Sequence, residues 1–260
     1  MAVITFMSDF GEQDHYVAAV KASILVQNPG VTIVDISHRV KSGDIGHAGY
    51  LLQSVFRDFP KGTVHLCSVG SSGKSKDKLL CLKIEDHFFV GPDSGVFSLI
   101  SEERPTAMVD VNALNSKPST FPSKEILAPA AAKLAGGYNI HEMGPSIDEI
   151  QELFARKLKV TKKEIAGNVI RVDHYGNLIT NINKKEFNII QGLNGNSPFN
   201  ITIGLENVRQ INETYSDVDS GDCFVFFNSN DLLEIGINKG NAAELLGLKL
   251  DTPIIITFQI

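Results

Sequence analysis

A carboxylate follows the first apolar run of the chain, at a position where α/β folds often bind ligands. The run Val3 to Phe6 leads into Ser8-Asp9-Phe10-Gly11, and Asp14 opens the amphipathic stretch that comes next. Ligands of open α/β sheets collect outside the carboxyl ends of the strands. A carboxylate at Asp9 can accept two hydrogen bonds from a ribose diol. The alternative is that Asp9 or Asp14 caps the following helix.

A second candidate is a glycine-rich loop with a lysine. The segment Gly70-Ser71-Ser72-Gly73-Lys74-Ser75 follows an apolar run and is a near miss to the Walker A loop that cradles phosphates. The first glycine of that motif falls on Ser68. The residues from Leu79 onward have the pattern of a strand, whereas a phosphate loop leads into a helix. A solvated loop is the preferred interpretation, and an ATP-binding, P-loop-like protein is the weaker alternative.

Polar and aromatic side chains suited to a purine occur late in the chain. The segment Asp173-His174-Tyr175-Gly176-Asn177 has the composition of a hairpin turn, and Asn177 offers the donor and the acceptor that an adenine edge needs. Asn228-Ser229-Asn230 is a turn of the same kind. Tyr215 and Phe226 provide aromatic faces, for which core packing is the alternative. The seven histidines have no metal-ligand spacing, so no metal site is predicted.

The composition excludes several classes of protein. The chain has 260 residues, of which 43% are hydrophobic and 21% are charged, as in ordinary globular proteins. The net charge is −6 and no stripe of lysine and arginine is present, so nucleic acid is not an expected partner. No apolar run has the length of a membrane span, and the N-terminus lacks the basic region of a signal peptide. We therefore expect a cytoplasmic protein with no membrane partner, in which Cys67, Cys81 and Cys223 are reduced.

The first part of the chain alternates between strand and helix patterns. Residues 1–155 are predicted to form an α/β domain, a mostly parallel sheet with flanking helices. Strands are expected over residues 3–6, 31–36, 63–67, 79–84, 88–91 and 107–111, and helices over 14–27, 44–56 and 126–134. The segments 79–84 and 88–91 are expected to pair as a hairpin.

The later part has a different pattern. Residues 156–164 are charged and are interpreted as a linker, and residues 165–260 are predicted to form an all-β, barrel-like domain. Short β-branched runs occur at 169–172, 178–182, 199–203, 224–227 and 254–258, separated by turns rich in Asn, Gly and Asp. A single helical stretch, 241–246, is expected to interrupt them.

Six short motifs occur in an order that resembles the S-adenosylmethionine (SAM) hydroxide adenosyltransferase family, the relatives of the SAM-dependent fluorinase and chlorinase. The resemblance runs nearly from end to end. The motifs are Phe6-Met7-Ser8-Asp9-Phe10-Gly11 with Asp14 and Tyr16, Val34-Asp35-Ile36-Ser37-His38, Val90-Gly91-Pro92-Asp93-Ser94-Gly95, Ala128-Pro129-Ala130-Ala131, Val172-Asp173-His174-Tyr175-Gly176-Asn177 with Thr180-Asn181-Ile182, and Asn238-Lys239-Gly240-Asn241-Ala242-Ala243.

The resemblance implies a fold and an activity. Members have an α/β domain followed by a β-barrel and are typically trimers, with SAM bound between subunits. Water, hydroxide or halide attacks C5′ of the SAM ribose and methionine leaves, with no cofactor besides SAM itself. The implied ligand contacts are Asp9 on the ribose, Asp14 and Asp173 near the methionine amino group, Asn177 and Ser229 on the adenine edge, Tyr175 and Tyr215 stacked on adenine with Phe226 nearby, and Phe121 and Ser123 near the reacting carbon.

The sequence departs from the family at the nucleophile. Hydrolytic members carry an Asp-Arg-His triad that orients the water, and the corresponding positions here are Gly70, Asp77 and Pro122. The serine of the halogenating branch has a counterpart in Ser123, but the tyrosine of that branch falls on Gly70. Two interpretations remain. One is an enzyme that cleaves SAM through a rearranged water site, weakly or not at all. The other is a non-catalytic sensor that binds SAM or adenosine.

Overall fold

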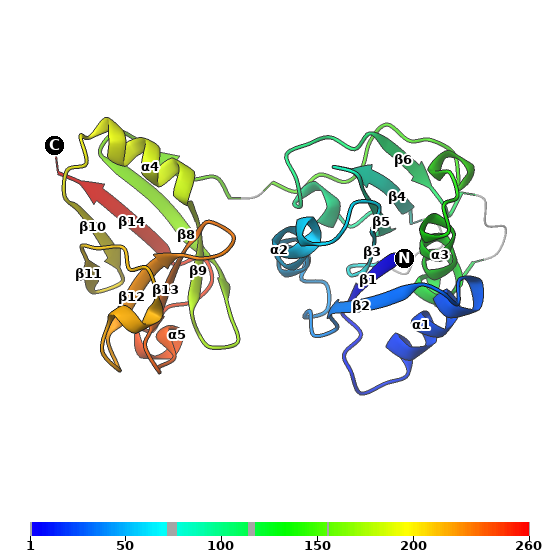
Figure 1. Cartoon of the computed structure of the whole chain (residues 1–260), viewed down its shortest axis with the longest axis horizontal. Helices are drawn as coiled ribbons and strands as arrows, with labels where there is room; N and C mark the ends of the chain where they lie inside the picture. The colour runs from blue at the N-terminus through cyan, green and yellow to red at the C-terminus, as the bar shows by residue number, and fades with distance from the viewer. Residues whose placement is uncertain (1, 72–76, 114–117, 155, 260) are drawn as a thin grey trace. The chain divides into compact units, whose positions relative to one another are not determined.

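The chain folds as two compact units, Met1–Ala155 and Arg156–Ile260, in a computed structural model that describes residues 2–71, 77–113, 118–154 and 156–259 (Figure 1). Each unit has its own hydrophobic core. None of the helices in these residues has the length and apolar character that crossing a bilayer requires.

A six-stranded sheet with the order β2-β1-β3-β5-β4-β6 forms the centre of the first unit. The pairs β1–β2, β1–β3 and β3–β5 are parallel, whereas β4 runs antiparallel to both β5 and β6. The expected mostly parallel sheet is therefore a mixed one. Glu85 and Asp86 both have positive φ and reverse the chain tightly between β4 and β5, as the expected hairpin requires. The strands are β1 (Val3–Ser8), β2 (Thr32–Ser37), β3 (Val64–Ser68), β4 (Leu79–Ile84), β5 (His87–Pro92) and β6 (Ala107–Asp110).

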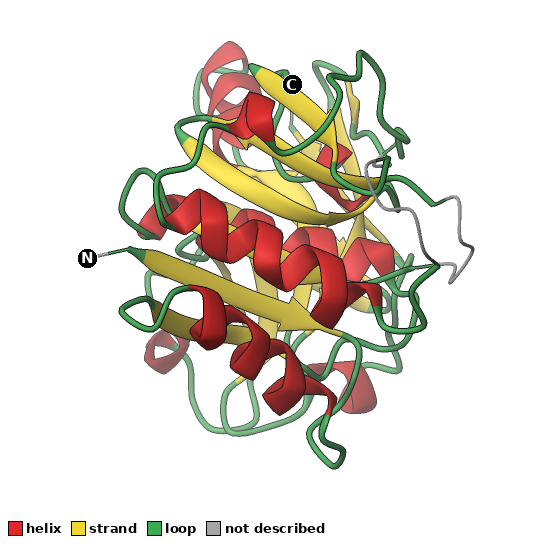
Figure 2. Ribbon diagram, turned by 90° about the vertical axis from the view of Figure 1, so that its right-hand side faces the viewer, coloured by secondary structure: helices red, strands yellow, loops and turns green. Residues whose placement is uncertain are grey.

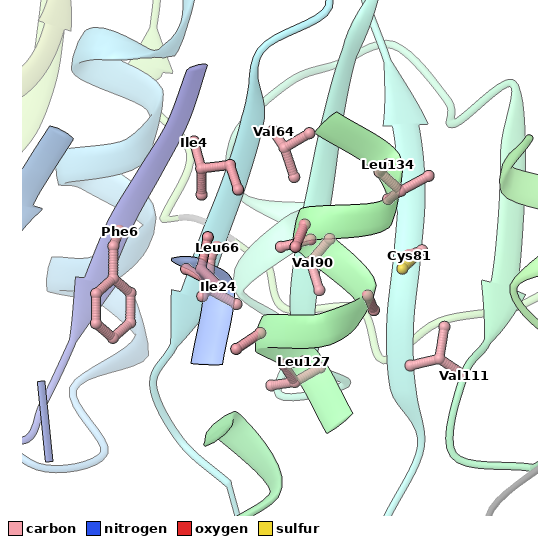
Figure 3. Packing of buried hydrophobic residues seen from close by; sticks show 14 of the residues in the cluster. Ile4, Phe6, Ile24, Val64, Leu66, Cys81, Val90, Val111, Leu127 and Leu134 are labelled. Atoms are coloured by element: carbon pink, nitrogen blue, oxygen red, sulfur yellow. The ribbon is translucent and has the colours of Figure 1, made fainter. Parts of the chain in front are cut away.

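Helices cover both faces of this sheet. Alternate residues of a strand point to opposite faces, so Ile4 and Phe6 pack in one cluster with α1 and α3, and Met7 packs in another with α2. Figure 3 shows the first cluster, in which Ile24 of α1 and Leu134 of α3 lie among the buried side chains of the strands. Figure 2 views this unit from the side of these two helices. The helices are α1 (Tyr16–Gln27), α2 (Ile45–Val55) and α3 (Ala128–Ala135), the last preceded by a π-helical turn, Ser123–Leu127.

The second unit is an antiparallel, barrel-like sheet of eight strands. Its order is β11-β10-β14-β8-β9-β13-β12, with β7 paired to β8. One face of the sheet buries isoleucines such as Ile165, Ile201 and Ile256. The strands are β7 (Lys159–Val160), β8 (Glu164–Val172), β9 (Leu178–Asn183), β10 (Phe199–Ile203), β11 (Glu206–Val208), β12 (Cys223–Phe227), β13 (Leu232–Ile237) and β14 (Pro253–Phe258).

The second unit contains elements that the sequence pattern did not indicate. Besides the expected short helix, α5 (Ala242–Leu245), it has a ten-residue helix, α4 (Lys184–Leu193), so the expectation of a single helix is wrong. Asn183 caps α4 by accepting a hydrogen bond from the backbone N–H of Glu186, and Phe187 and Ile190 are its buried face. Strand β13 also lies outside the expected runs.

Candidate functional site

Three neighbouring parallel strands of the first unit end at one cavity. The loops after β1, β3 and β5 begin at Asp9, Val69 and Asp93. Together with the segment before α2 they line an open cavity of about 600 Å³. Among its lining residues are Asp9, Gly43, Gly70, Asp77, Ser94 and Gln151. The position agrees with the general rule that open α/β sheets bind ligands at the carboxyl ends of their strands.

Behind Asp9, polar side chains of β1, β2 and α1 contact one another in a row. Ser8 Oγ lies 2.8 Å from His38 Nδ1, and His38 Nε2 lies 3.1 Å from Asp35 Oδ1. Lys21 Nζ donates to Asp35 at 2.5 Å. Burial alone raises the pKa of Asp35, but hydrogen bonds from Lys21 and His38 and their charges lower it overall, so the carboxylate stays charged. These side-chain contacts fix the turn that carries Asp9.

The Asp9 carboxylate keeps most of its acceptor capacity. Its Oδ2 accepts one hydrogen bond, 3.1 Å, from the backbone N–H of Gly43, and no other described residue donates to it. Neither Asp9 nor Asp14 caps the next helix, because the N-cap of α1 is His15 and that helix has no side-chain cap. Asp14 is exposed. The capping alternative is therefore wrong for both residues, and the Asp9 carboxylate is free to bind a ligand at the cavity.

The three positions that the family resemblance assigns to the catalytic triad lie around two adjoining hollows. Gly70 and Asp77 line the large cavity, and Asp77 also lines a much smaller one with Pro122. Gly70 has a φ of +76°, and a Cβ built there would lie 2.2 Å from Ile45 Cδ1. Any side chain at position 70 is thus strained. The residues of the Gly-Lys-Ser loop at 72–76 lie outside the described residues, and strand β4, not a helix, follows them.

An aromatic cluster lies near the same end of the sheet. The ring centroids of Phe10, Tyr16 and Phe121 are 5.5–6.0 Å apart in pairs with tilted or edge-on geometry. Ser123, which begins the π-helical turn after Phe121, is buried. The structure therefore brings Phe121 and Ser123, two predicted residues, to the N-terminal end of α3, and brings Phe121 to the start of α1.

In the second unit, a pocket of about 360 Å³ brings three predicted residues together. Tyr215, Phe226 and Ser229 line it with Asn228 and the turn before Tyr215. Tyr215 is 64% exposed, so its ring is accessible. Phe226 is half-buried and stacks on Phe224 with a centroid distance of 5.1 Å and an interplanar angle of 2°. Aromatic faces and a hydroxyl around one hollow suit a planar, polar-edged ligand.

Asp173 and Asn177 lie in the turn between β8 and β9. Asp173 Oδ1 accepts hydrogen bonds from the backbone N–H groups of Tyr175 and Asn177, so this carboxylate stabilises the turn in which it lies. The Asn177 amide donates to Glu234 Oε1 at 3.0 Å, and the Asn228 amide donates to Glu234 Oε2 at the same distance. Tyr175 is 75% exposed, and none of Asp173, Tyr175 and Asn177 is among the residues that line the pocket.

Glu234 is the residue that sequence reasoning missed. Val225, Leu233 and Ile235 face the barrel core, so Phe226 and its cross-strand neighbour Glu234 face away from it. Glu234 is nevertheless only 9% exposed. The local sequence offers little signal, because a glutamate between the inward-facing Leu233 and Ile235 is ordinary on the outer face of a strand.

Both parts of the chain match models of one family. Residues 4–144 match the SAM hydroxide adenosyltransferase N-terminal domain, and residues 167–255 match the C-terminal domain of the same family. An (R)-S-adenosyl-L-methionine hydrolase from Thermus thermophilus is 29% identical over 98% of this chain and 99% of its own length. A fluorinase from an Actinoplanes species is 24% identical over 98% of this chain and 97% of its own.

Solved structures have the same fold. The crystal structure of an uncharacterized conserved protein from Thermotoga maritima superposes with a TM-score of 0.86 and 30% identity, covering 98% of this chain and 99% of that one. A conserved hypothetical protein from Thermus thermophilus gives a TM-score of 0.77 with 29% identity over 98% of this chain and the whole of the other.

Proposed function

The chain belongs to the SAM hydroxide adenosyltransferase family, and from this premise we propose that it binds SAM and hydrolyses it slowly to adenosine and methionine. The observation that carries the proposal is the convergence of Tyr215, Phe226 and Ser229 around one pocket. These are residues that the family resemblance assigns to adenine. In the first unit, the accessible Asp9 carboxylate is the group for the ribose hydroxyls.

The reaction asks little of the protein's side chains. The oxygen of a water molecule forms a bond to C5′, the bond between C5′ and sulfur breaks, and the electron pair stays on the sulfur of methionine. The proton that water loses passes to solvent. A sulfonium is already a good leaving group, so holding the water in line with the breaking bond and excluding other solvent can supply most of the acceleration.

The positions around the nucleophile explain why the proposed rate is low. Gly70 has no side chain, and Pro122 has no polar side-chain atom. Asp77 is a carboxylate at the position where the resemblance implies an arginine in hydrolytic members. Water positioning and general-base assistance are commonly worth ~10²–10⁴-fold in rate. Without the family's triad, the proposed enzyme keeps the contribution of alignment and lacks most of this factor.

The same positions favour a second candidate, a non-catalytic sensor of SAM or adenosine. One experiment separates the two functions. SAM is incubated with the purified full chain, and adenosine and methionine are followed by chromatography. Their release in equal amounts, above a control without protein, supports the hydrolase. Binding of intact SAM with no release supports the sensor, and no binding of SAM or adenosine contradicts both.

The resemblance also implies an assembly. We propose a homotrimer in which the ligand is shared between subunits, with no cofactor besides SAM and with neither nucleic acid nor a membrane as partner, in the cytoplasm. Light scattering with and without adenosine measures this. Adenosine should raise the apparent stability of the trimer, because a ligand that bridges subunits favours the assembled state. A monomer that binds adenosine tightly contradicts the sharing.

Asp9→Asn tests the ribose contact directly. The substitution removes the charge and one acceptor while keeping the shape, and it should weaken adenosine binding by ~1–3 kcal/mol, the usual range for a charge-assisted hydrogen bond. Calorimetric titration measures the affinity. Asp58→Asn, an exposed site before β3, is the matched control and should bind as the wild type does. Unchanged affinity in a folded Asp9→Asn protein contradicts the assignment.

A further inference from the structure

Glu234 is a buried carboxylate whose two oxygens bind two different loops. Its strand partner on β12 is Phe226, which lines the pocket, so both side chains lie on the same outward face of the sheet. Burying a carboxylate is costly unless hydrogen bonds replace its water. Two amide groups do so here, one from the β8–β9 turn and one from the β12–β13 turn. The same two hydrogen bonds that stabilise the carboxylate also fix the orientations of the two amide groups.

The backbone determines which way round the Asn228 amide lies. Asn228 Oδ1 accepts hydrogen bonds from the backbone N–H groups of Asn230 at 3.0 Å and Leu232 at 3.2 Å. The oxygen of this amide is therefore committed to its own turn, and its nitrogen must face Glu234. Asn228 thus anchors one oxygen of Glu234 and leaves the other for Asn177.

The Asn177 amide is oriented in turn. Its nitrogen donates to Glu234 Oε1 at 3.0 Å and lies 3.5 Å from Asp173 Oδ2. Both neighbours are carboxylates, which only accept, so both amide hydrogens are taken. The remaining polar atom of the side chain is Oδ1, to which no residue that the structure describes donates. This oxygen lies over Gly236, where an added Cβ would be 2.6 Å from it and 2.1 Å from the Phe224 ring that stacks on Phe226.

We propose that Glu234 sets the base preference of the nucleoside site by fixing the Asn177 amide with its oxygen free, so that the site favours a 6-amino purine over a 6-oxo purine. The 6-amino group of adenosine donates a hydrogen bond to such an oxygen, whereas the 6-oxo group of inosine presents another acceptor to it. Glu234 is a positioning residue in this scheme. The inference rests on the proposed function, because it takes Asn177 as the residue that contacts the base.

Glu234→Gln is the decisive variant, since it keeps the size of the side chain. The oxygen of the introduced amide will accept from the fixed Asn228 amide, so the introduced nitrogen will face Asn177 and favour the reversed orientation of the Asn177 amide. Adenosine and inosine are titrated calorimetrically into the full-length protein. The wild type should prefer adenosine by about tenfold or more, one hydrogen bond's worth, and Glu234→Gln should lose most of that preference.

Two further variants separate positioning from general damage. Glu244→Gln, an exposed glutamate on α5, is the matched control and should keep the wild-type ratio of affinities. Asn177→Ala should lose the preference by itself. If Glu234 acts through Asn177, adding Glu234→Gln to Asn177→Ala should change the ratio no further, the non-additivity expected of coupled residues. A purely structural role would lower both affinities together and leave the ratio unchanged.

The outcomes distinguish the two levels of the proposal. A wild type that binds adenosine and a folded Glu234→Gln that keeps its preference overturn the role of Glu234 alone. A ratio that Glu234→Gln changes equally with and without Asn177 also overturns it. A wild type that binds neither adenosine nor SAM overturns the proposed function as well. If Glu234→Gln does not fold, the binding of purine riboside to the wild type tests whether Asn177 presents its oxygen to the base. It lacks the 6-amino group and should bind the wild type more weakly than adenosine, and equal binding contradicts the free oxygen.

Discussion

The two units hold their candidate groups in different ways. In the first, Asp9, Gly70 and Asp77 lie on loops at strand ends around an open cavity, and the carboxylate of Asp9 accepts one hydrogen bond from the described residues. In the second, Phe224 and Glu234 lie on strands and are buried on the face opposite the barrel core. The first arrangement leaves the Asp9 carboxylate with acceptor capacity for a ligand. In the second, the Glu234 carboxylate and the amide nitrogens of Asn177 and Asn228 orient one another.

This difference has a consequence for tolerance to change. A loop residue at a cavity can lose its ligand contact while the fold survives, because little packs against it. A residue in the buried network of the second unit takes part in packing and orientation together. The second unit should therefore lose stability and binding in the same variant, while in the first the two should separate, as they should in Asp9→Asn.

Gly236→Ala should cause the largest combined loss of stability and adenosine binding. If it does not, the proposed difference between the two units is wrong. An added Cβ would lie 2.1 Å from Phe224 Cζ and 2.6 Å from Asn177 Oδ1. Phe224 is only 3% exposed, so its ring has little room to move. Overpacking of this kind costs ~1–3 kcal/mol of stability, and we expect a value near the top of that range together with a loss of adenosine binding. Denaturant unfolding and calorimetry measure the two.

Gly192→Ala is the matched control for that variant. Gly192 lies in α4 with nothing within 4 Å of an added Cβ and without a positive φ. Alanine there should stabilise the protein by about 0.5–1 kcal/mol, because glycine is a poor residue in a helix. If Gly236→Ala has the same free energy of unfolding and the same affinity for adenosine as the wild type, the outward face of the second unit is not tightly packed.

The pH dependence of stability should come from the first unit more than from the second. His65 Nδ1 lies 2.7 Å from Thr5 Oγ1, and His65 Nε2 lies 3.1 Å from His87 Nδ1. Burial, with a smaller contribution from the charge of His87, lowers the pKa of His65 from 6.5 to about 3. The unfolded chain therefore binds a proton between these values that the folded chain does not. Stability is fully present above pH 6.5 and falls below it by about 1.4 kcal/mol per pH unit for this group.

The measurement is the free energy of unfolding at about pH 7.5 and about pH 5.5, on either side of the ordinary histidine pKa, for the wild type and for His65→Gln. The variant should lose less stability than the wild type between these two values, because the titrating group has been removed. His174→Gln, an exposed histidine in the second unit, should change with pH as the wild type does. An equal loss of stability on acidification in the wild type and in His65→Gln would falsify the assignment to His65.

The sequence predicted the first unit better than the second for a physical reason. Apolar runs that end in polar turns mark both the strands and the loops of an α/β domain, so the position of Asp9 after β1 at the sheet edge could be predicted. Gly70, Asp77 and Pro122, identified by resemblance alone, also lie around adjoining hollows. What failed was strand direction. The predicted β4–β5 hairpin makes β4 antiparallel to β5, and β4 also pairs antiparallel with β6, so the sheet is mixed.

In the second unit, the pattern identified groups one at a time and missed what connects them. Asn177, Phe226 and Ser229 were singled out individually, yet Glu234, which links the turn of Asn177 to that of Asn228, was not. Period-two alternation assigns Glu234 to the outside of the sheet, where a glutamate is ordinary. Its burial depends on segments far away in the sequence that cover this face, which alternation along one strand does not encode.

Helix α4 was missed although its start has a local signal, and the cap provides the smallest and cleanest test of the comparison. Asn183 Oδ1 accepts the backbone N–H of Glu186 at 2.8 Å, whereas α1 in the first unit has no side-chain cap and Asp14 before it makes none. Asn183→Ala should therefore cost ~1 kcal/mol, the usual value of a lost N-cap. Asp14→Ala should leave the free energy of unfolding within about 0.5 kcal/mol of the wild type, as exposed substitutions do. Denaturant unfolding of both variants measures the difference.

If Asp14→Ala costs as much stability as Asn183→Ala, the Asp14 carboxylate caps α1 and is not available to a ligand. If neither costs anything, the packing of Phe187 and Ile190 holds α4 without its cap.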